Sequence, residues 1–446
     1  MNKTLGIVSL GCAKNQVDSE VMLGLLKDKG YKIVNRSIDA EVIIVNTCGF
    51  IETAKEESLN AILEQAKFKK HGKCKTLVVA GCLAERYNKE LLEQIPEIDA
   101  IVGSGDYMKI ASVLDEVNEG ERVCKYGSIN QTFTGHLPRV VSSSKPTAYL
   151  KIAEGCDNRC TYCIIPSLRG EYRSKPLNYV LDEAKNLARQ GFKELILVAQ
   201  DITRYGQDSN GQYDLNLLLR ELCKIEGVKW IRLLYAYPDR ITKELINTIA
   251  TEDKICKYLD IPIQHISQKI LTSMNRTSNS SDIVRLVKYI REKIPAIVLR
   301  TSLIVGFPGE SEEDFKELED FLEEGYFDHV GIFTYSREEG TTAALMDMQI
   351  AHEIKLERQQ KLYAIQKRIS KRLNRKRMGQ SCDILIEGLD SDGVYYGRSY
   401  GETLESDGLV YVLSNIDLQV GSFYKVRINK AYEYDLLGEV EDNELS

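Results

Sequence analysis

The 446-residue sequence predicts an α/β multidomain protein: an open parallel α/β sheet, a central partial (β/α)6 barrel and a small antiparallel β-barrel, in that order. Three observations support this prediction. Short runs rich in valine and isoleucine alternate with amphipathic segments up to about residue 118. Six further strand-like runs, again separated by helical patterns, extend from residue 148 to about residue 336. Short alternating runs with glycine turns make up the last segment.

The first unit carries three cysteines in one topological position. Its strand candidates are LGIVSL, EVIIVN, TLVVA and AIVG, and the amphipathic segments between them include 18–29, 53–68 and 85–94. Cys12, Cys48 and Cys82 each follow one of these strands, in SLGC, VNTC and VAGC. Because the carboxyl ends of parallel strands share one edge of the sheet, where ligands bind, we expect the three thiols to lie together. The alternative interpretation is three buried structural cysteines.

The central unit carries a second trio of cysteines within one loop. Cys156, Cys160 and Cys163 stand in EGCDNRCTYC, at the end of the first strand-like run, YLKIAEG. Three sulfurs are one fewer than a structural zinc site needs, and the ferredoxin runs supply a fourth cysteine. A four-iron cluster on three thiolates would keep one iron open to another ligand. A partial zinc site or ordinary buried cysteines are the alternatives.

Six βα units are too few for a closed eight-stranded barrel, so we expect an open, TIM-like partial barrel with a wide mouth. Its strand-like runs are YLKIAEG, ELILVAQ, WIRLLYAY, YLDIPIQ, IVLRTSLIVG and HVGIFTYS. Helical patterns intervene near 177–189, 215–224, 242–250, 281–293 and 312–324. A basic helical stretch, 354–377, leads to the runs CDILIEG, LVYVLS and YKVRINKAY, which predict a barrel of about five strands.

Composition and charge narrow the class of protein. With 43% apolar residues the chain can bury several ordinary cores. Its eleven cysteines are an odd number without a secretory signal ahead of them, and no apolar run reaches the ~18 residues of a membrane helix. We therefore expect a cytoplasmic protein with reduced thiols and no membrane partner. Residues 379–446 contain four basic and fourteen acidic residues, a net charge of −10, which leaves +3 for residues 1–378.

Taken together, the motifs resemble the radical S-adenosylmethionine (SAM) methylthiotransferase family over nearly the whole chain. The spacing C-x3-C-x2-C, with Tyr162 before the last cysteine, is similar to the SAM-cleaving motif. The other resembling stretches are SLGCAKNQVDSE, NTCGFIETAKEES, GCLAERY, IIPSLRGEYRS, AQDITRYG, YPDRIT, IPIQHIS, GFPGE and YDLLGE. Ala13, where the family usually carries proline, and the YDLLGE ending are minor departures.

The resemblance implies four segments and two kinds of cofactor. The segments are a methylthiotransferase domain at 1–125, a linker at 126–147, a radical SAM core at 148–375 and a TRAM barrel at 376–446. The cofactors are two [4Fe-4S] clusters and SAM. The implied cluster ligands form two trios, the catalytic Cys156, Cys160 and Cys163 and the auxiliary, sulfur-donating Cys12, Cys48 and Cys82.

Contacts to SAM are implied at three further positions. The backbone at Tyr162 would lie beside adenine, and Gln200 would lie near the methionine amine. Arg300 and the LIVGFPGE run would grip the carboxylate, ribose and adenine. The Gly-Phe-Pro-Gly sequence is equally well explained as an ordinary turn at the end of a strand. His265 is either a pocket residue or a hydrogen-bonded structural histidine.

Two substrates suit such an enzyme: the β-carbon of an aspartate in small-subunit ribosomal protein S-twelve, and an adenosine in transfer RNA. Phosphate neutralisation dominates nucleic-acid affinity, so a transfer RNA would favour a basic terminal barrel. The acidic segment 379–446 would instead attract a basic ribosomal protein. The basic run 367–377 is either a contact to ribosomal RNA or a solvated helix face. We expect the ribosomal protein as substrate, free or within the ribosome, an external electron donor and a monomeric enzyme.

Two alternatives belong to other classes of protein. A non-catalytic iron–sulfur electron carrier would bind iron yet release no 5′-deoxyadenosine after reduction. This alternative does not explain the presence of the six βα units and the terminal barrel. A zinc-binding scaffold would be colourless when purified without air, whereas iron–sulfur clusters absorb visible light.

Overall fold

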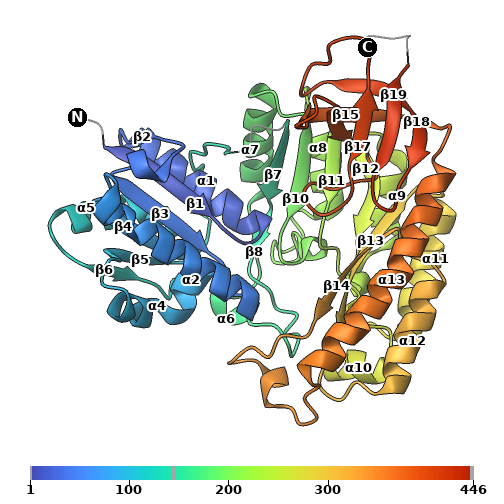
Figure 1. Ribbon diagram of the computed structural model, residues 1–446, viewed down its shortest axis with the longest axis horizontal. Coiled ribbons are helices and arrows are strands. Elements are labelled where there is room, and N and C mark those ends of the chain that lie inside the picture. The colour runs from blue at the N-terminus through green and yellow to red at the C-terminus, as the bar shows by residue number, and fades with distance from the viewer. Residues whose placement is uncertain (1–2, 134, 143–145, 442–446) are drawn as a thin grey trace.

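The computed structural model describes residues 3–133, 135–142 and 146–441. These residues form two six-stranded sheets, a closed five-stranded barrel and a two-stranded ribbon (Figure 1). The expected order of an α/β sheet, a partial barrel and a small β-barrel is thereby confirmed. Of the segment expected as a linker, residues 134 and 143–145 lie outside the described residues.

The N-terminal sheet is parallel throughout, with strand order β2-β1-β3-β4-β5-β6. Its strands are β1 (Thr4–Ser9), β2 (Lys32–Ile33), β3 (Val42–Thr47), β4 (Thr76–Gly81), β5 (Ala100–Gly103) and β6 (Val123–Lys125). Its helices are α1 (Ala13–Asp28), α2 (Glu52–Ala66), α3 (Phe68–His71), α4 (Cys82–Gln94) and α5 (Ile110–Asn118), with the 3-10 turns η1 (Ser37–Asp39) and η2 (Tyr107–Lys109). Helices α1 and α5 cover one face, and α2 and α4 cover the other. Strands β3 and β4 are therefore buried on both faces and have continuous apolar runs.

The central sheet is also parallel, and its strands lie in chain order, β14-β13-β12-β11-β10-β7. Its strands are β7 (Thr147–Lys151), β10 (Glu194–Val198), β11 (Trp230–Leu233), β12 (Ile255–Asp260), β13 (Val298–Val305) and β14 (His329–Thr334). Its helices are α6 (Ile165–Arg169), α7 (Leu177–Arg189), α8 (Leu215–Cys223), α9 (Lys243–Thr251), α10 (Gln268–Ser273), α11 (Ser280–Lys293) and α12 (Glu312–Glu323), with η3 (Ile202–Arg204), η4 (Pro238–Arg240) and η5 (Thr342–Leu345). Its two edge strands do not pair with each other, so the barrel is open.

The C-terminal unit follows the long helix α13 (His352–Lys376) and is a closed barrel in the order β15-β16-β17-β19-β18. Its strands are β15 (Ser381–Leu389), β16 (Tyr395–Arg398), β17 (Val410–Leu413), β18 (Phe423–Ala431) and β19 (Leu436–Val440). Four of the five pairings are antiparallel, as expected for this barrel, and the fifth, between β17 and β19, is parallel. The reason is the connection: the chain passes from β17 to β18 without pairing them, and β19 then returns beside β17.

The three units pack against one another. Helix α1 packs against β7 of the central sheet. A single apolar cluster joins Val17 of α1, Trp230 and Tyr258 of the partial barrel, and Leu385 and Leu404 of the terminal barrel. The terminal barrel lies over one end of the partial barrel and the N-terminal sheet lies to its side (Figure 1). Among the described residues, none of the helices is both long and apolar enough to cross a bilayer.

Candidate active site

Three adjacent strands of the N-terminal sheet lead to cysteines. Cys48 directly follows β3, Cys82 directly follows β4 as the first residue of α4, and Cys12 precedes α1 after β1. Because β1, β3 and β4 are neighbours in the sheet, the three residues lie at the edge formed by the carboxyl ends of these strands, as we expected from the sequence. Burial, and then the nearby thiol of Cys82, raises the pKa of Cys48 to about 12.

Glycine and asparagine hold these loops close together. Gly11 has a φ of +86°, and a Cβ added there would lie 2.8 Å from Cβ of Cys48. The fully buried side chain of Asn15 donates through Nδ2 to the carbonyl of Leu10 at 3.1 Å and to that of Thr47 at 2.9 Å. Asn15 therefore ties together the ends of β1 and β3, directly before the two cysteine loops.

Cations beside this trio favour thiolates, which are the form that binds metals. Burial acts to raise the pKa of Cys12, but Lys14 and Arg169 outweigh it, so the pKa lies below its usual value. At Cys82 burial prevails and the pKa is raised, although Arg169 acts in the opposite direction with its Nε 3.4 Å from Sγ. The donor chemistry of the trio fits an iron–sulfur cluster.

The second trio lies in the loop between β8 (Ala153–Glu154) and α6. Strand β8 pairs with β9 (Arg173–Ser174), and the amide of Cys156 donates to the carbonyl of Gly170 at 3.0 Å. The amide of Cys163 donates to the carbonyl of Cys160, also at 3.0 Å. Burial, and to a lesser degree the nearby Cys160, raises the pKa of Cys156 to about 11. The loop is thus compact, with its three thiols half-buried.

Hydrogen bonds from the end of α10 fix the same loop. Thr161 donates its amide to the carbonyl of Met274 at 3.1 Å and its hydroxyl to that of Ser273 at 2.8 Å. Nδ2 of Asn275 donates to the carbonyl of Arg159 at 2.9 Å. The loop that carries the second trio is therefore held by the fold around it.

Neither trio is arranged around a single ion. Within residues 3–133, 135–142 and 146–441, no three His, Cys, Asp or Glu side chains form a group with the geometry of a metal site. The fold brings the three cysteines of each trio to one location and thereby gathers three thiol donors there.

Gln200 lies just beyond β10, next to β7, and therefore at the mouth of the partial barrel. Its Nε2 donates to Oε1 of Glu154 at 2.7 Å. Its buried Oε1 has no hydrogen-bond partner among the described residues. An unpartnered buried acceptor fits a ligand that brings a donor, such as the amine of SAM.

Tyr162 lies with the GFPGE run. It packs in an apolar cluster with Met274 and with Phe307, which belongs to that run. Oε2 of Glu310 accepts hydrogen bonds from the amides of Gly306 at 2.7 Å and Phe307 at 3.1 Å, which holds the turn. The fold therefore brings two of the sequence-predicted SAM elements into contact.

Arg300 faces the terminal barrel. Its Nη1 lies 3.0 Å from Asp260 and its Nε 3.5 Å from Asp407 of the loop after β16, so its contact with SAM stays a prediction. His265 is fully buried, its Nδ1 accepts a hydrogen bond from the amide of Ser267 at 3.0 Å, and burial lowers its pKa to about 3. These contacts favour the structural interpretation of His265.

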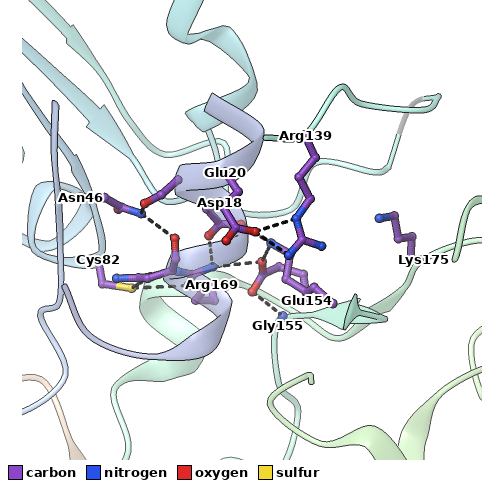
Figure 2. Close-up of polar contacts among 12 residues, drawn as sticks. Asp18, Glu20, Asn46, Cys82, Arg139, Glu154, Gly155, Arg169 and Lys175 are labelled. Atoms are coloured by element: carbon purple, nitrogen blue, oxygen red, sulfur yellow. Dashed lines mark hydrogen bonds and ion pairs between the residues drawn. The ribbon is translucent and has the colours of Figure 1, made fainter. Parts of the chain in front are cut away.

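The buried polar residues between the two trios were not predicted from the sequence. Arg169 of α6 lies between Cys82 and Glu154, and Glu154 stands two residues before Cys156 (Figure 2). Lys151 belongs to the same group, with its Nζ 2.8 Å from Glu154. The sequence contained one indication of this buried polar group: the otherwise apolar run YLKIAEG has two charged residues, and buried charges need partners.

Three family models match successive parts of the chain. They are the uncharacterized protein family UPF0004 over residues 4–103, the radical SAM superfamily over residues 150–322 and the TRAM domain over residues 378–440.

Full-length relatives are about half identical to the chain. The ribosomal protein uS12 methylthiotransferase RimO of Thermoanaerobacter sp. is 51% identical over 437 residues, which cover 98% of this chain and 100% of the relative. The protein of the same name from Clostridioides difficile is 51% identical over 436 residues, which cover 98% of both chains.

Solved structures with similar folds are more distant in sequence. TsrM from Kitasatospora setae, a radical SAM methyltransferase solved with cobalamin and a [4Fe-4S] cluster, has a TM-score of 0.57 at 15% identity over 77% of each chain. OxsB, a cobalamin-dependent SAM radical enzyme, has a TM-score of 0.51 at 13% identity over 81% of this chain and 56% of its own. At these identities the similarity concerns the fold alone, which is that of radical SAM proteins.

Proposed function

Since the chain belongs to the family of ribosomal protein uS12 methylthiotransferases named RimO, and so to the radical SAM enzymes, we propose that it adds a methylthio group to the β-carbon of an aspartate in uS12, the small-subunit protein S-twelve. The observation that carries this proposal is the 51% identity to a relative of that name over 98% of the chain. The family implies an iron–sulfur cluster of the [4Fe-4S] type and SAM.

We propose two such clusters, one on each cysteine trio. The ligands would be Cys156, Cys160 and Cys163 for the catalytic cluster and Cys12, Cys48 and Cys82 for the auxiliary one. When bound with SAM, the catalytic cluster would supply the electron that splits SAM into methionine and a 5′-deoxyadenosyl radical, the auxiliary cluster would supply sulfur, and a second SAM would supply the methyl group. This assignment is supported by the chemistry of the thiol donors and by the fold, which brings the three cysteines of each trio to one location.

Side chains of the barrel mouth would bind and orient SAM. Oε1 of Gln200 would accept a hydrogen bond from the SAM amine, while Glu154 holds the other end of the amide at 2.7 Å. The backbone at Tyr162 would lie beside adenine, and the apolar cluster around Tyr162 and Phe307 would exclude water from the reacting carbon. A contact from Arg300 would compete with its ion pair to Asp260.

The proposed division of tasks follows the chain. Residues 1–125 would provide the auxiliary cluster, 126–147 the linker, 148–375 the radical chemistry and 376–446 the TRAM barrel. An external donor would provide electrons to a monomeric enzyme. Because its substrate is ribosomal, the enzyme would work in the cytoplasm.

Charge supports a protein substrate. Residues 379–446 carry a net charge of −10, which would attract a basic ribosomal protein and repel RNA phosphates. The opposing feature is the basic end of α13, where Arg375 and Lys376 occupy the last turn. A ribosome-bound uS12 would place ribosomal RNA within reach of such a helix end, so this feature does not require transfer RNA as substrate.

Mass spectrometry of uS12 and of transfer RNA from a strain that lacks this gene tests the proposal. We expect uS12 to lose the mass of one methylthio group and an aspartate to be the residue concerned. Loss of the group from adenosine alone would show that the transfer-RNA alternative is right. A reduced protein that binds iron yet releases no 5′-deoxyadenosine from SAM would favour the electron carrier.

A further inference from the structure

One arginine contacts both halves of the proposed site. Arg169 is the last residue of α6, the helix that begins two residues after Cys163, and its side chain is 2% exposed. Its Nε lies 3.4 Å from Sγ of Cys82, at the edge of the N-terminal sheet (Figure 2). The helix that follows the catalytic cysteine loop therefore carries a hydrogen-bond donor to a thiol of the auxiliary trio.

Three further contacts fix the orientation of the guanidinium. Nη1 of Arg169 lies 2.8 Å from Oδ2 of Asp18 and 3.0 Å from Oε2 of Glu154. Nη2 donates to Oδ1 of Asn15, the residue that ties together the ends of β1 and β3. Because the guanidinium is planar and its donors have fixed directions, these contacts determine where Nε points, which is toward Cys82.

The surrounding charges balance. Lys151 forms ion pairs with Asp18 and, at 2.8 Å, with Glu154, so two cations face two carboxylates in a region that is nearly closed to solvent. The positive charge of Arg169 is thus largely compensated by the carboxylates. Its distinctive effect on Cys82 is a directed N–H···S hydrogen bond.

We propose that Arg169 is a positioning residue of the auxiliary cluster, which fixes Cys82 and raises the reduction potential of that cluster through its N–H···S hydrogen bond. The inference rests on the proposed function, in which Cys82 is a ligand. A hydrogen bond to a ligand sulfur stabilises the more negative, reduced cluster, and such bonds are among the factors that set iron–sulfur potentials.

The test measures the auxiliary cluster alone. In the full chain, Cys156→Ala, Cys160→Ala and Cys163→Ala together remove the catalytic trio, and the protein is reconstituted anaerobically with iron and sulfide. The midpoint potential is measured by a redox titration followed by electron paramagnetic resonance. Arg169→Gln should shift the reduction equilibrium at least tenfold toward the oxidised cluster, which is about 59 mV for a one-electron couple.

Two variants separate this effect from a general loss of stability. Arg139→Gln removes another buried arginine, which pairs with Glu20 (Figure 2) and, at 2.6 Å, with Glu183, and which has no sulfur contact among the residues that the structure describes. It should lower stability without changing the potential. Arg169→Lys keeps the charge but loses the rigid fork, so it should give a smaller shift in the same direction, and it carries the test if the glutamine variant does not fold.

The outcomes are distinct. An unchanged potential in an Arg169 variant that binds its full complement of iron would overturn the inference, as would an equal shift in Arg139→Gln. Failure of the proposed auxiliary cluster would be visible earlier, because the background protein with Arg169 intact would then bind no iron, and failure of the proposed substrate would be visible separately in the mass spectra of uS12.

Discussion

Asn15→Ala is expected to separate the loops of Cys12 and Cys48. The fully buried amide of Asn15 donates two hydrogen bonds to main-chain carbonyls, at 3.1 and 2.9 Å. Since each buried group left without a partner costs about 1–3 kcal/mol, the loss of both should lower the free energy of unfolding by about 2–6 kcal/mol. The auxiliary trio should lose its iron, whereas the catalytic trio, held by separate contacts, should keep its own.

Urea denaturation of the iron-free protein measures the first effect, and iron analysis after anaerobic reconstitution measures the second. Asn186→Ala is the matched control, because Asn186 lies exposed on α7 and its side-chain oxygen accepts a surface hydrogen bond from Arg189 at 2.8 Å. It should change stability by less than about 0.5 kcal/mol. If Asn15→Ala behaved like this control in both assays, the proposed tie between the two strand ends would be refuted.

Three further changes test other parts of the structure. Gly11→Ala should reduce auxiliary iron, because φ is +86° and the added Cβ would lie 2.8 Å from Cβ of Cys48. Glu338→Ala should lower the melting temperature and expose the N-terminal unit to proteases, because buried Glu338 lies 2.9 Å from Arg86 and 3.1 Å from Lys55, and losing these charge-assisted contacts should cost about 1–3 kcal/mol. Burial opposes ionisation of Glu183, but adjacent cations lower its pKa from 4.5 to about 2. Its contribution of about 3 kcal/mol should therefore be full above pH ~4.5 and disappear as the pH falls toward 2, a dependence that urea midpoints should show and Glu183→Gln should reduce.

Matched variants serve as controls for these changes. Gly30 has a φ of +89° with open space around it, so Gly30→Ala tests backbone strain without a clash and should leave iron content unchanged. Glu357 forms an exposed pair with Lys361, and Glu357→Ala should not alter protease sensitivity. Equal effects of Gly11→Ala and Gly30→Ala on iron content, or of Glu338→Ala and Glu357→Ala on cleavage, would contradict the reasoning. A pH dependence unchanged in Glu183→Gln would do the same for the third prediction.

The positions of strands could be predicted wherever burial produces a continuous apolar pattern. The run EVIIVN became β3 and TLVVA became β4, because both strands are covered on both faces. The helix expected at 177–189 is α7, whose apolar side packs on the sheet while its other side is solvated. Once the strands were known, the common edge of Cys12, Cys48 and Cys82 followed from topology alone.

The start of α1 could not be predicted in this way. The pattern placed the helix at 18–29, whereas it begins at Ala13. Its first turns carry polar residues that are normally interpreted as loop or surface, yet Asn15, Asp18 and Glu20 are buried between two units. Their partners, such as Arg169 and Arg139, are more than a hundred residues away, and periodicity along one segment contains no information on such pairings.

Short elements and the surroundings of the residues proposed to bind SAM also could not be predicted from local sequence patterns. Strand β2 has two residues and helix α10 has six, too few to establish a period. The ion pair of Arg300 with Asp407 of the terminal barrel depends on how two units pack, which the motif around Arg300 does not encode.

Iron and sulfide analysis of the anaerobically purified protein, with Mössbauer spectra, tests the central claim of two four-iron clusters most directly. Wild-type protein should contain about eight irons, because each trio would hold four. Cys12→Ala and Cys156→Ala should each remove about half of them, the first without loss of SAM cleavage and the second with its complete loss. Four irons in the wild type, and the same four in Cys12→Ala, would contradict the account.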